Sequence, residues 1–309
     1  MKMSYMSTFT GCGAFELALE EVFPETECVA WSEIKKSAIT TFTEKFPQYS
    51  TLNIGDIEKY CFDVTEEGRL KPNVDRIKAL PDFDMLFGGS SCQDLSVQTS
   101  SRSGILGVKS RVFFSFYIIL KIKKPKYFLL ENVASMSKKD KKIMTKYVSD
   151  AYGKPIEPVM LDSGLLSAQN RKRLYWCNWP IEVPKDRGIT FPEIVAYSKS
   201  SRYRCKKTGK VFSSPAPDRE YYKEERRRKD GKANTLVTGK GCSGPSTSNY
   251  LLDENGNERH LKVSEAEVLQ GLPIGHTNCV SEGQAFDLIG NAVSVPAVRY
   301  IFEQLKERM

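Results

Sequence analysis

The stretch FTGCGAFELALEEVFPETECVAWS, residues 9–32, decides the fold class of this 309-residue chain. The residues up to about Phe9 are typical of a β-strand, and a turn with two glycines follows them. The apolar residues of 14–22 then recur at the i, i+3, i+4 and i+7 spacing of an amphipathic helix. Residues 28–32 predict a second strand, so the stretch predicts a strand, a helix and another strand in succession.

The same alternation continues through the first two-thirds of the chain. Strands are expected over 83–87, 127–130, 158–161 and 174–176, and helices over 37–46, 111–122 and 139–148. This order predicts an α/β fold with a doubly wound, mostly parallel sheet, which binds ligands at the carboxyl ends of its strands.

Regular periodicity fades after Trp179, where prolines and a basic run replace it. A smaller second domain is therefore expected over 180–284, beside a first domain over 1–179. From Gly290 the pattern returns as a turn, and a helix that begins at Pro296 is expected to run to the end of the chain. Residues 285–309 are expected to close the first domain.

The composition favours a soluble, unexported protein and excludes several kinds of site. With 40% hydrophobic residues the chain can bury a large core, but no run approaches the roughly 18 apolar residues of a membrane span. The eight cysteines contain no C-x-x-C pair, and none clusters beside His260 or His276. Neither a zinc site nor a disulfide framework is therefore expected.

One segment carries the whole excess of positive charge. The net charge is +8, and residues 199–232 alone hold 13 basic and 5 acidic residues, with four aromatic residues among them. Basic and aromatic residues together favour contact with a polyanion. A solvated charged loop is the alternative interpretation of this segment.

The turn after the first strand favours an adenosyl ligand without phosphates. The dinucleotide-binding pattern G-x-G-x-x-G would require glycine where Glu16 stands, and an acid is unfavourable beside a pyrophosphate. A nicotinamide or flavin oxidoreductase is therefore disfavoured. Glu33 ends the second expected strand, where a carboxylate can accept ribose hydroxyls, and Asp56 could accept the exocyclic amine of adenine.

Cys92 lies in a Gly/Ser-rich stretch directly after the strand expected over 83–87, and we interpret it as a nucleophile. Only the thiolate attacks, so a positive neighbour or a helix N-terminus must favour its ionisation. Glu131 is expected at another strand end, partly desolvated and able to share a proton with a substrate nitrogen. Arg171 and Arg173 are expected to point the same way, so that one of them could reach a substrate oxygen or support Glu131. An ordinary ion-pair cluster is the alternative.

Eight motifs, taken in order, resemble those of the DNA (cytosine-5) methyltransferases: FTGCGAF, WSEI, NIGDI, GGSSCQDLS, KPKYFLLENV, AQNRKRLYW, KANTLVTG and LIGNAVSVP. The resemblance covers nearly the whole chain except about 180–230, which would be the variable recognition region. It implies a Rossmann-like, S-adenosylmethionine-dependent fold with a small target-recognition domain. It also implies methyl transfer to C5 of a flipped-out cytosine in duplex DNA, through a covalent bond between Cys92 and C6.

The resemblance assigns three groups of residues. Those expected to bind S-adenosylmethionine are Phe9, Gly11, Gly13, Glu33, Asp56, Asn291 and Val293. Those expected to act on the cytosine are Cys92, Glu131, Arg171 and Arg173. Those expected to contact DNA are Gln93, Ser96, Arg204, Lys206, Lys207, Arg226, Arg227, Arg228 and Thr235.

Two positions depart from the family pattern. Ser91 stands where the family has proline before the cysteine, so the backbone there lacks a fixed φ. Ala14 replaces the third glycine of the turn, a small change that is expected to be tolerated.

Two rival functions stay open. A tRNA cytosine-5 methyltransferase would share the strand before Glu-Asn-Val, but the Cys-Phe-Thr element of that branch is absent between Pro180 and Thr235. A non-catalytic DNA-binding homologue is disfavoured because Cys92, Glu131 and Arg173 are all present. The expected protein is a cytoplasmic monomer of bacterial or phage origin, related to restriction-modification enzymes, that binds double-stranded DNA and no metal.

Overall fold

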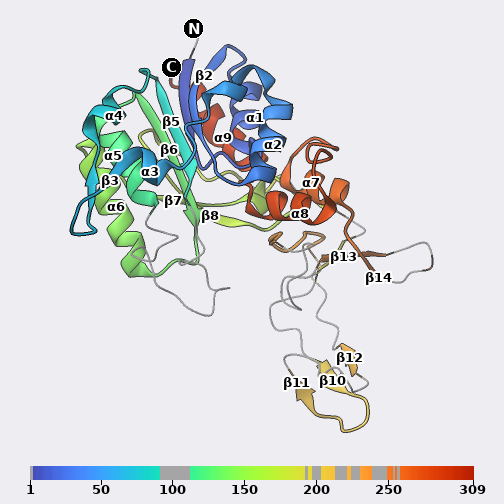
Figure 1. Ribbon diagram of the computed structural model, residues 1–309. Helices are drawn as coiled ribbons and strands as arrows, with labels where there is room; N and C mark the ends of the chain where they lie inside the picture. The colour runs from blue at the N-terminus through green and yellow to red at the C-terminus, as the bar shows by residue number, and fades with distance from the viewer. Residues whose placement is uncertain are drawn as a thin grey trace. The chain divides into compact units, whose positions relative to one another are not determined.

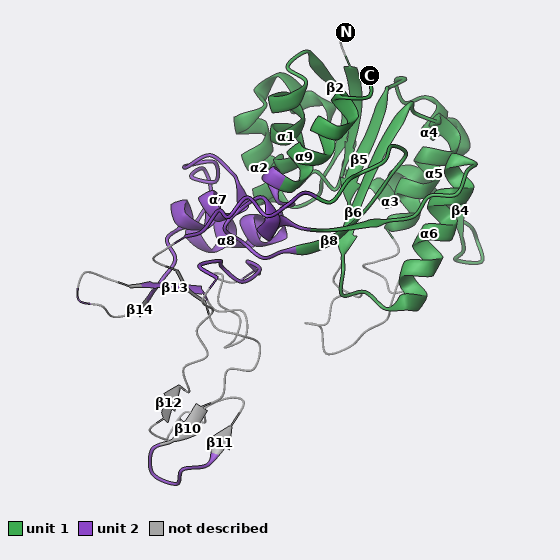
Figure 2. Ribbon diagram, turned by 180° about the vertical axis from the view of Figure 1, so that it is seen from behind, with its two compact units in different colours: residues 1–161, 172–183, 297–309 green, residues 162–171, 184–296 purple. Residues whose placement is uncertain are grey.

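The computed structural model describes residues 3–90, 112–191, 194–196, 203–212, 221–223, 230–238, 249–252, 255 and 258–309. The chain divides into two compact units (Figure 2). Unit 1 comprises 1–161, 172–183 and 297–309, and unit 2 comprises 162–171 and 184–296. Unlike the domains expected from the sequence, this division places 162–171 and 285–296 in unit 2. A recognition role for 180–284 stays a prediction.

Unit 1 is built on a sheet with the strand order β2-β1-β5-β6-β8-β7. The parallel pairs join β2 to β1, β1 to β5 and β5 to β6, whereas β8 runs antiparallel to β6. The prediction of a mostly parallel sheet is therefore confirmed. The strands are β1 Met3–Thr8, β2 Thr26–Ser32, β5 Met85–Gly89, β6 Tyr127–Val133, β7 Val159–Asp162 and β8 Lys172–Cys177.

Helices cover both faces of this sheet (Figure 1). On one face, Phe15 and Phe302 contact the ring of Phe87 in β5. On the other, Phe116 packs in the same buried cluster as Leu86, because successive strand side chains alternate between faces. The first face carries α1 Ala14–Val22, α2 Lys36–Lys45 and α9 Val295–Lys306, and the second carries α3 Ile57–Cys61, α4 Val74–Lys78, α5 Phe113–Lys123 and α6 Lys138–Tyr152.

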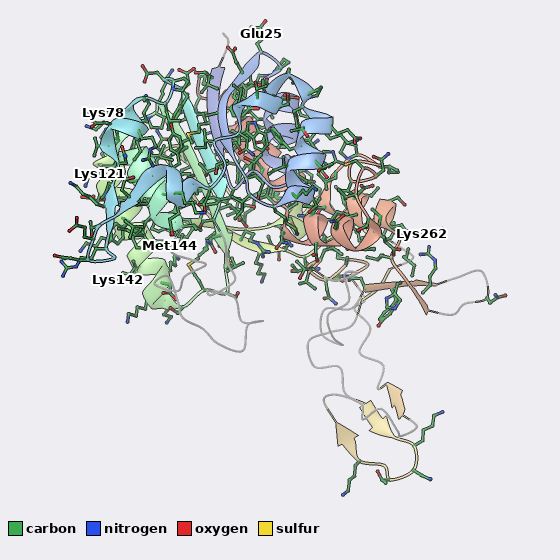
Figure 3. The ribbon with its side chains drawn as sticks, in the orientation of Figure 1. Glu25, Lys78, Lys121, Lys142, Met144 and Lys262 are labelled. Atoms are coloured by element: carbon green, nitrogen blue, oxygen red, sulfur yellow. The ribbon has the colours of Figure 1, made fainter. Side chains whose placement is uncertain are left out.

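Helix α6 shows how the sequence sets these faces. Met144, Val148 and Ala151 recur at helical spacing and are buried, whereas the side chain of Lys142 projects outward (Figure 3). Unit 1 also contains a 3₁₀ helix at Pro47–Leu52, which contacts α2 and β2, and a hairpin of β3 Phe62–Val64 and β4 Leu70–Pro72. Within the described residues, no helix combines the length and the apolar character that a membrane crossing requires.

Unit 2 combines short antiparallel strands with helices. In the described residues one sheet has the order β14-β13-β9 and another the order β11-β10-β12. The strands are β9 Ile194–Ala196, β10 Tyr203–Cys205, β11 Val211–Phe212, β12 Tyr221–Lys223, β13 Asn249–Leu252 and β14 Glu258–His260. The helices are the 3₁₀ helix η3 Ser163–Leu165, α7 Val263–Gln270 and α8 Glu282–Asn291.

The turn expected at Gly290 is wrong, because this residue lies inside α8. A Cβ atom added at Gly290 would lie 2.6 Å from the carbonyl carbon of Val237. The glycine therefore permits two backbone segments to approach closely, which a sequence pattern cannot separate from a turn signal.

Glu16 lies on the buried face of α1, with 0% of its surface exposed. Burial raises the pKa of its carboxyl group to about 8, and the nearby charge of Glu20 adds to the shift. The side chain is therefore neutral in the folded protein at neutral pH. This explains how an acid is accommodated in the first turn of the helix that follows the glycines.

We expect the folded state to lose stability as the pH rises from about 4.5 to about 8. Over that range the unfolded chain releases the Glu16 proton while the folded chain keeps it, so the unfolded state binds fewer protons. Glu16→Gln should remove this dependence and be more stable than the wild type at pH 8 by a few kcal/mol, at about 1.4 kcal/mol per pKa unit. Thermal melts between pH 5 and 8.5, with exposed Glu66→Gln as control, test this, and parallel curves for all three proteins would contradict it.

Candidate active site

The carboxyl ends of the parallel strands in unit 1 bring together side chains from distant parts of the sequence. Phe9 follows β1, Glu33 follows β2, and Ser90 follows β5. Because β8 is reversed, its early residue Arg173 pairs with Val133 at the end of β6. This edge is where open α/β sheets bind their ligands.

The turn after β1 has the backbone geometry of a binding loop. Gly11 and Gly13 have φ values of +60° and +86°, and Phe9 has +55°, which is rare for a residue with a side chain. A Cβ atom on Gly13 would lie 2.5 Å from the ring of Phe46, so only glycine fits there. A Cβ atom on Gly11 would meet only the Phe9 carbonyl oxygen at 3.9 Å, so the backbone of Gly11 is open to a ligand.

Glu33 fastens this turn to the end of β2. Its Oε2 accepts a hydrogen bond of 2.9 Å from the Gly11 N–H. Its Oε1 accepts 2.8 Å bonds from the N–H groups of Ile34 and Lys35. A carboxylate offers about four lone-pair positions, so Glu33 can still accept a ribose hydroxyl while it holds the turn.

Asp56 is the N-cap residue of α3. Its Oδ1 accepts hydrogen bonds from the N–H groups of Glu58 and Lys59, at 3.0 and 3.4 Å. Its Oδ2 lies 3.7 Å from Lys59 Nζ at the protein surface. The cap fixes the direction of the carboxylate, and Oδ2 retains the capacity to accept a hydrogen bond from an amine.

These features suit an adenosyl ligand such as S-adenosylmethionine. The open backbone at Gly11, the carboxylate of Glu33 and the oriented carboxylate of Asp56 belong to unit 1. Asn291 and Val293 belong to unit 2, where Asn291 Nδ2 donates to the Asp287 carbonyl and Val293 is buried. Their predicted part in the same pocket stays a prediction.

Glu131 and Arg173 form a buried ion pair near the carboxyl end of β6. Arg173 Nε lies 2.9 Å from Glu131 Oε1, and their side chains are only 13% and 10% exposed. A carboxylate and a guanidinium at such a site stabilise each other's charge. The sequence left two roles open for the arginines, contact with a substrate oxygen and support of Glu131. The ion pair gives Arg173 the second role.

Arg171 has entirely different partners, all in unit 2. Its Nη1 donates to the Leu236 carbonyl at 2.9 Å, and Nη2 donates to the carbonyls of Gly290 and Ala292 at 3.0 and 2.8 Å. The expectation that Arg171 and Arg173 point the same way is wrong, because β8 begins at Lys172 and Arg171 precedes the alternation of the strand. These contacts make Arg171 a residue that holds unit 2 together.

Gln169 joins the same network, because it also binds the backbone of Leu236. Its amide nitrogen donates to the Leu269 carbonyl and to Gln270 Oε1, and its oxygen accepts from the Leu236 N–H, all at 2.9 Å. Thr235, predicted to contact DNA, donates its hydroxyl to the Asn170 carbonyl at 2.7 Å. Gln169, Asn170 and Arg171 of the AQNRKR motif therefore organise the interior of unit 2.

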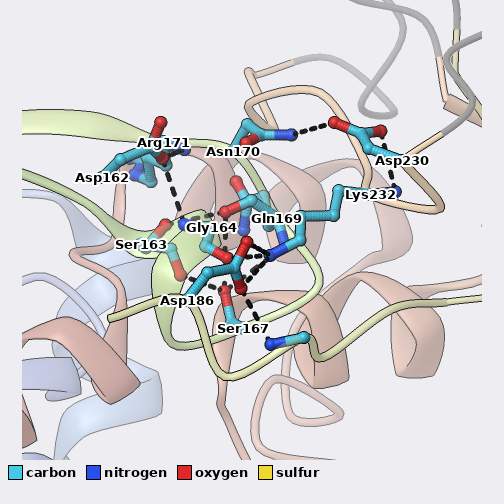
Figure 4. Close-up of polar contacts among 11 residues, drawn as sticks. Asp162, Ser163, Gly164, Ser167, Gln169, Asn170, Arg171, Asp186, Asp230 and Lys232 are labelled. Carbon is cyan, nitrogen blue, oxygen red and sulfur yellow. Dashed lines mark hydrogen bonds and ion pairs between the residues drawn. The ribbon is translucent and has the colours of Figure 1, made fainter. Parts of the chain in front are cut away.

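Lys232 belongs to this network although it lies at the end of the basic run. Its side chain is 7% exposed, and Nζ lies 2.8 and 3.1 Å from the two carboxylate oxygens of Asp186. Nζ also donates to the Gly164 carbonyl (Figure 4). This lysine is therefore an internal contact of unit 2, whereas Lys206 and Lys207 are exposed.

We expect Arg171→Met to destabilise the protein by roughly 3–5 kcal/mol. Methionine fills a similar volume, but it removes the guanidinium donor from the buried carbonyl groups of Leu236 and Gly290 and leaves the Ala292 carbonyl with the Gln270 amide as donor. Urea unfolding followed by circular dichroism measures the loss. Lys172→Met, at the exposed neighbouring position, is the control and should shift stability by less than about 0.5 kcal/mol. Equal stability of the two variants would contradict this assignment of Arg171.

Several predicted residues lie outside the described part of the chain: Cys92, Gln93, Ser96, Arg226, Arg227 and Arg228. The backbone of Arg204 is described in β10, but its side chain is not. Among the described cysteines, burial raises the pKa of both Cys61 and Cys177 to about 12, which makes them poor nucleophiles. Their roles are therefore in packing.

Sequence reasoning missed Asn132 and Gln169 as site residues. Each stands inside a motif that was recognised, Asn132 between Glu131 and Val133, and Gln169 two positions before Arg171. Both side chains are completely buried, which distinguishes them from surface amides, because a buried amide requires hydrogen-bond partners. Burial of this kind cannot be read from single polar letters in a sequence.

Comparison with known proteins agrees with this geometry. A family model for C-5 cytosine-specific DNA methylase matches residues 3–178 and 178–307. The Type II methyltransferase M.NlaX of Neisseria lactamica is 28% identical over 324 aligned positions, which cover 96% of this chain and 94% of the relative. The orphan methyltransferase M.Rho11sI of Bacillus phage rho11s is 37% identical over 179 positions, covering 56% of this chain and 32% of that protein.

The fold is shared with solved structures as well. The crystal structure of the S. pombe Dnmt2 methyltransferase has a TM-score of 0.66 and 18% sequence identity, with 99% of each chain covered. That likeness concerns the fold alone, whereas the family model spans nearly the entire sequence. This chain therefore belongs to the C-5 cytosine-specific DNA methylase family.

Proposed function

We propose that this protein transfers a methyl group from S-adenosylmethionine to C5 of a cytosine in double-stranded DNA. The observation that carries the proposal is the buried Glu131–Arg173 pair at the carboxyl edge of the sheet. Strand β5, which leads to Ser90 and so to Cys92 two residues later, pairs with the strand of Glu131 through Gly89. Glu131 therefore lies on the strand next to the one that precedes Cys92 in the sequence, which supports the proposal.

The chemistry requires both groups, because cytosine C5 alone is too weak a nucleophile for a methyl group. The Cys92 thiolate forms a bond to C6, and the displaced electron pair makes C5 an enamine carbon. Glu131 stabilises the negative charge of this addition by sharing a proton with N3, and Arg173 holds the Glu131 carboxyl group in place. After methylation C5 releases its proton to solvent, and the electron pair left behind forms the C5–C6 double bond as the Cys92 thiolate leaves C6. The proton shared with N3 returns to Glu131, which restores the aromatic ring and both side chains.

S-adenosylmethionine, when bound, supplies the electrophilic methyl group on its sulfonium. The residues that would hold it are Phe9, Gly11, Gly13, Glu33 and Asp56 of unit 1, with Asn291 and Val293 of unit 2. The target cytosine must leave the base stack for Cys92 to reach C6, which requires a few kcal/mol. Contacts of Gln93, Ser96 and the basic segment with DNA would offset this requirement.

Labelling separates the DNA and RNA alternatives. The protein is incubated with tritiated S-adenosylmethionine and either duplex DNA or tRNA, and the expected result is label in DNA as 5-methylcytosine. Bisulfite sequencing of DNA from expressing cells then reports the modified position and its context. Label in tRNA alone would overturn the proposed substrate. The bacterial and phage relatives support a bacterial or phage origin for this activity.

The basic run 199–232 is proposed to neutralise DNA phosphates, and Lys206, Lys207 and Lys210 within it are exposed. If it contacts about five phosphates, log K should fall with log salt concentration with a slope of roughly −4 to −5. Binding of a fluorescent duplex between 50 and 300 mM salt measures this slope. A slope near zero would refute the phosphate contacts.

A further inference from the structure

Ser90 directly follows strand β5, two residues before Cys92, and is 4% exposed. The Asn132 amide nitrogen donates to the Ser90 hydroxyl oxygen at 2.9 Å and lies 3.2 Å from the Ser90 carbonyl oxygen. Asn132 is itself fully buried in β6, next to Glu131. The Asn132 side chain therefore contacts both oxygen atoms of Ser90, the residue after which the Cys92 segment begins.

The orientation of the Asn132 amide is fixed independently. Its Oδ1 accepts a 2.8 Å hydrogen bond from the backbone N–H of Val133. Because an N–H group requires an acceptor, the oxygen must face Val133 and the nitrogen must face Ser90. The Asn132 amide therefore has no freedom to flip, and Ser90 is bound by a rigid donor.

The contact between Asn132 and Ser90 restrains the backbone more in this chain, which has Ser91, than it would in a chain with proline at position 91. Proline fixes φ near −65°, whereas serine leaves the backbone torsion free. A contact that fixes the preceding residue can supply the missing restraint, and the Ser90 hydroxyl accepts a hydrogen bond that alanine or glycine at this position could not.

We propose that Ser90 is a positioning residue that sets the direction in which the Cys92 segment leaves the sheet, with the Asn132 amide as its anchor. The proposal rests on the proposed function for its catalytic consequence. Asn132 also adjoins Glu131, so the anchor ties the nucleophile segment to the strand that carries the proton donor. A thiol displaced by even 1 Å from its attack position can lose up to about 10²-fold in rate.

The test uses Ser90→Ala, which removes the hydroxyl contact but keeps the carbonyl contact. Single-turnover methylation of duplex DNA should slow about tenfold or more, while the dissociation constants of DNA and S-adenosylmethionine stay within twofold. Ser91→Pro added to Ser90→Ala should recover most of the lost rate, because proline restores a backbone restraint. A role in stability alone would not produce this recovery.

Ser4→Ala is the matched control. Ser4 also makes a side-chain hydrogen bond, of 2.9 Å to Asp84 Oδ2, but at the amino end of the same sheet. Its loss should affect the melting temperature and leave the rate within twofold. A wild-type rate in Ser90→Ala, or an equal loss in Ser4→Ala, would overturn the proposal.

Hydrogen exchange read by mass spectrometry separates this proposal from the proposed function. Amide hydrogens in peptides spanning 88–95 should exchange at least fivefold faster in Ser90→Ala than in the wild type, and those of β1 should not change. This measurement needs no substrate. Unchanged exchange refutes the anchor even in an active enzyme, whereas faster exchange in a protein that methylates no nucleic acid supports the anchor and refutes the function.

Discussion

Cys92→Ala is expected to abolish methyl transfer, with a loss of roughly 10⁴-fold or more in single-turnover rate. Without the sulfur no bond forms at C6, and C5 of the cytosine keeps the low nucleophilicity of an aromatic carbon. The affinity for S-adenosylmethionine should stay within twofold, because Cys92 is not among the residues proposed to bind it. Calorimetry with the cofactor and a tritium-transfer assay measure the two quantities separately.

Duplex DNA that contains 5-fluorocytosine makes the covalent step visible. Fluorine replaces the C5 hydrogen that must leave as a proton, so the adduct is trapped after methylation and shifts the protein band on a denaturing gel. The wild type should show the shift and Cys92→Ala should not. Cys279→Ala is the control, because Cys279 is a partly exposed thiol of unit 2. A wild type that binds DNA but traps no adduct on diverse sequences would favour a non-catalytic DNA-binding protein.

The sheet of unit 1 could be predicted because its strands and helices follow simple periods. The helix expected over 14–22 is α1 without a change in either boundary. The helix expected over 139–148 lies within α6, which ends at Tyr152 because Gly153 adopts the left-handed φ of +84° that caps the helix. Burial of one side of each element leaves a pattern that a sequence displays directly.

Helix α7 could not be predicted in the same way. Its buried side contains Glu267 and Gln270 as well as Ala266 and Leu269. The Glu267 carboxylate accepts hydrogen bonds from the N–H groups of Gly275 and Thr277 and from the Thr277 hydroxyl. A helix that buries polar groups against a loop has no apolar period, so its sequence is typical of an exposed segment.

The site shows the same division between local pattern and distant contact. Gly11 and Glu33 could be identified because a glycine turn and an acid about 20 residues later form a spaced motif. The partners of Arg171, by contrast, lie 65 to 121 positions away in the sequence. Only the folded chain shows that Arg171 and Arg173, two residues apart, belong to different networks.

Glu131→Gln should lower the methylation rate by about 10²- to 10³-fold, because glutamine fills the same space but cannot transfer a proton to the cytosine ring. Arg173→Met should cause a similar loss for a different reason. It leaves the Glu131 carboxyl group in a site of low exposure without its counter-charge or its orientation. Rates are measured in single turnover on a methylatable duplex at saturating cofactor.

The double variant decides whether the two side chains act as one unit. Arg173 contacts the carboxyl group of Glu131 at 2.9 Å, so if its catalytic effect passes through that group, removing it after Glu131→Gln should cost little more. We therefore expect the double variant to lie within about threefold of the slower single variant. Multiplied losses would instead show that Arg173 contacts the substrate independently. In that case the guanidinium would act on the cytosine directly, and the ion pair would describe only the resting enzyme.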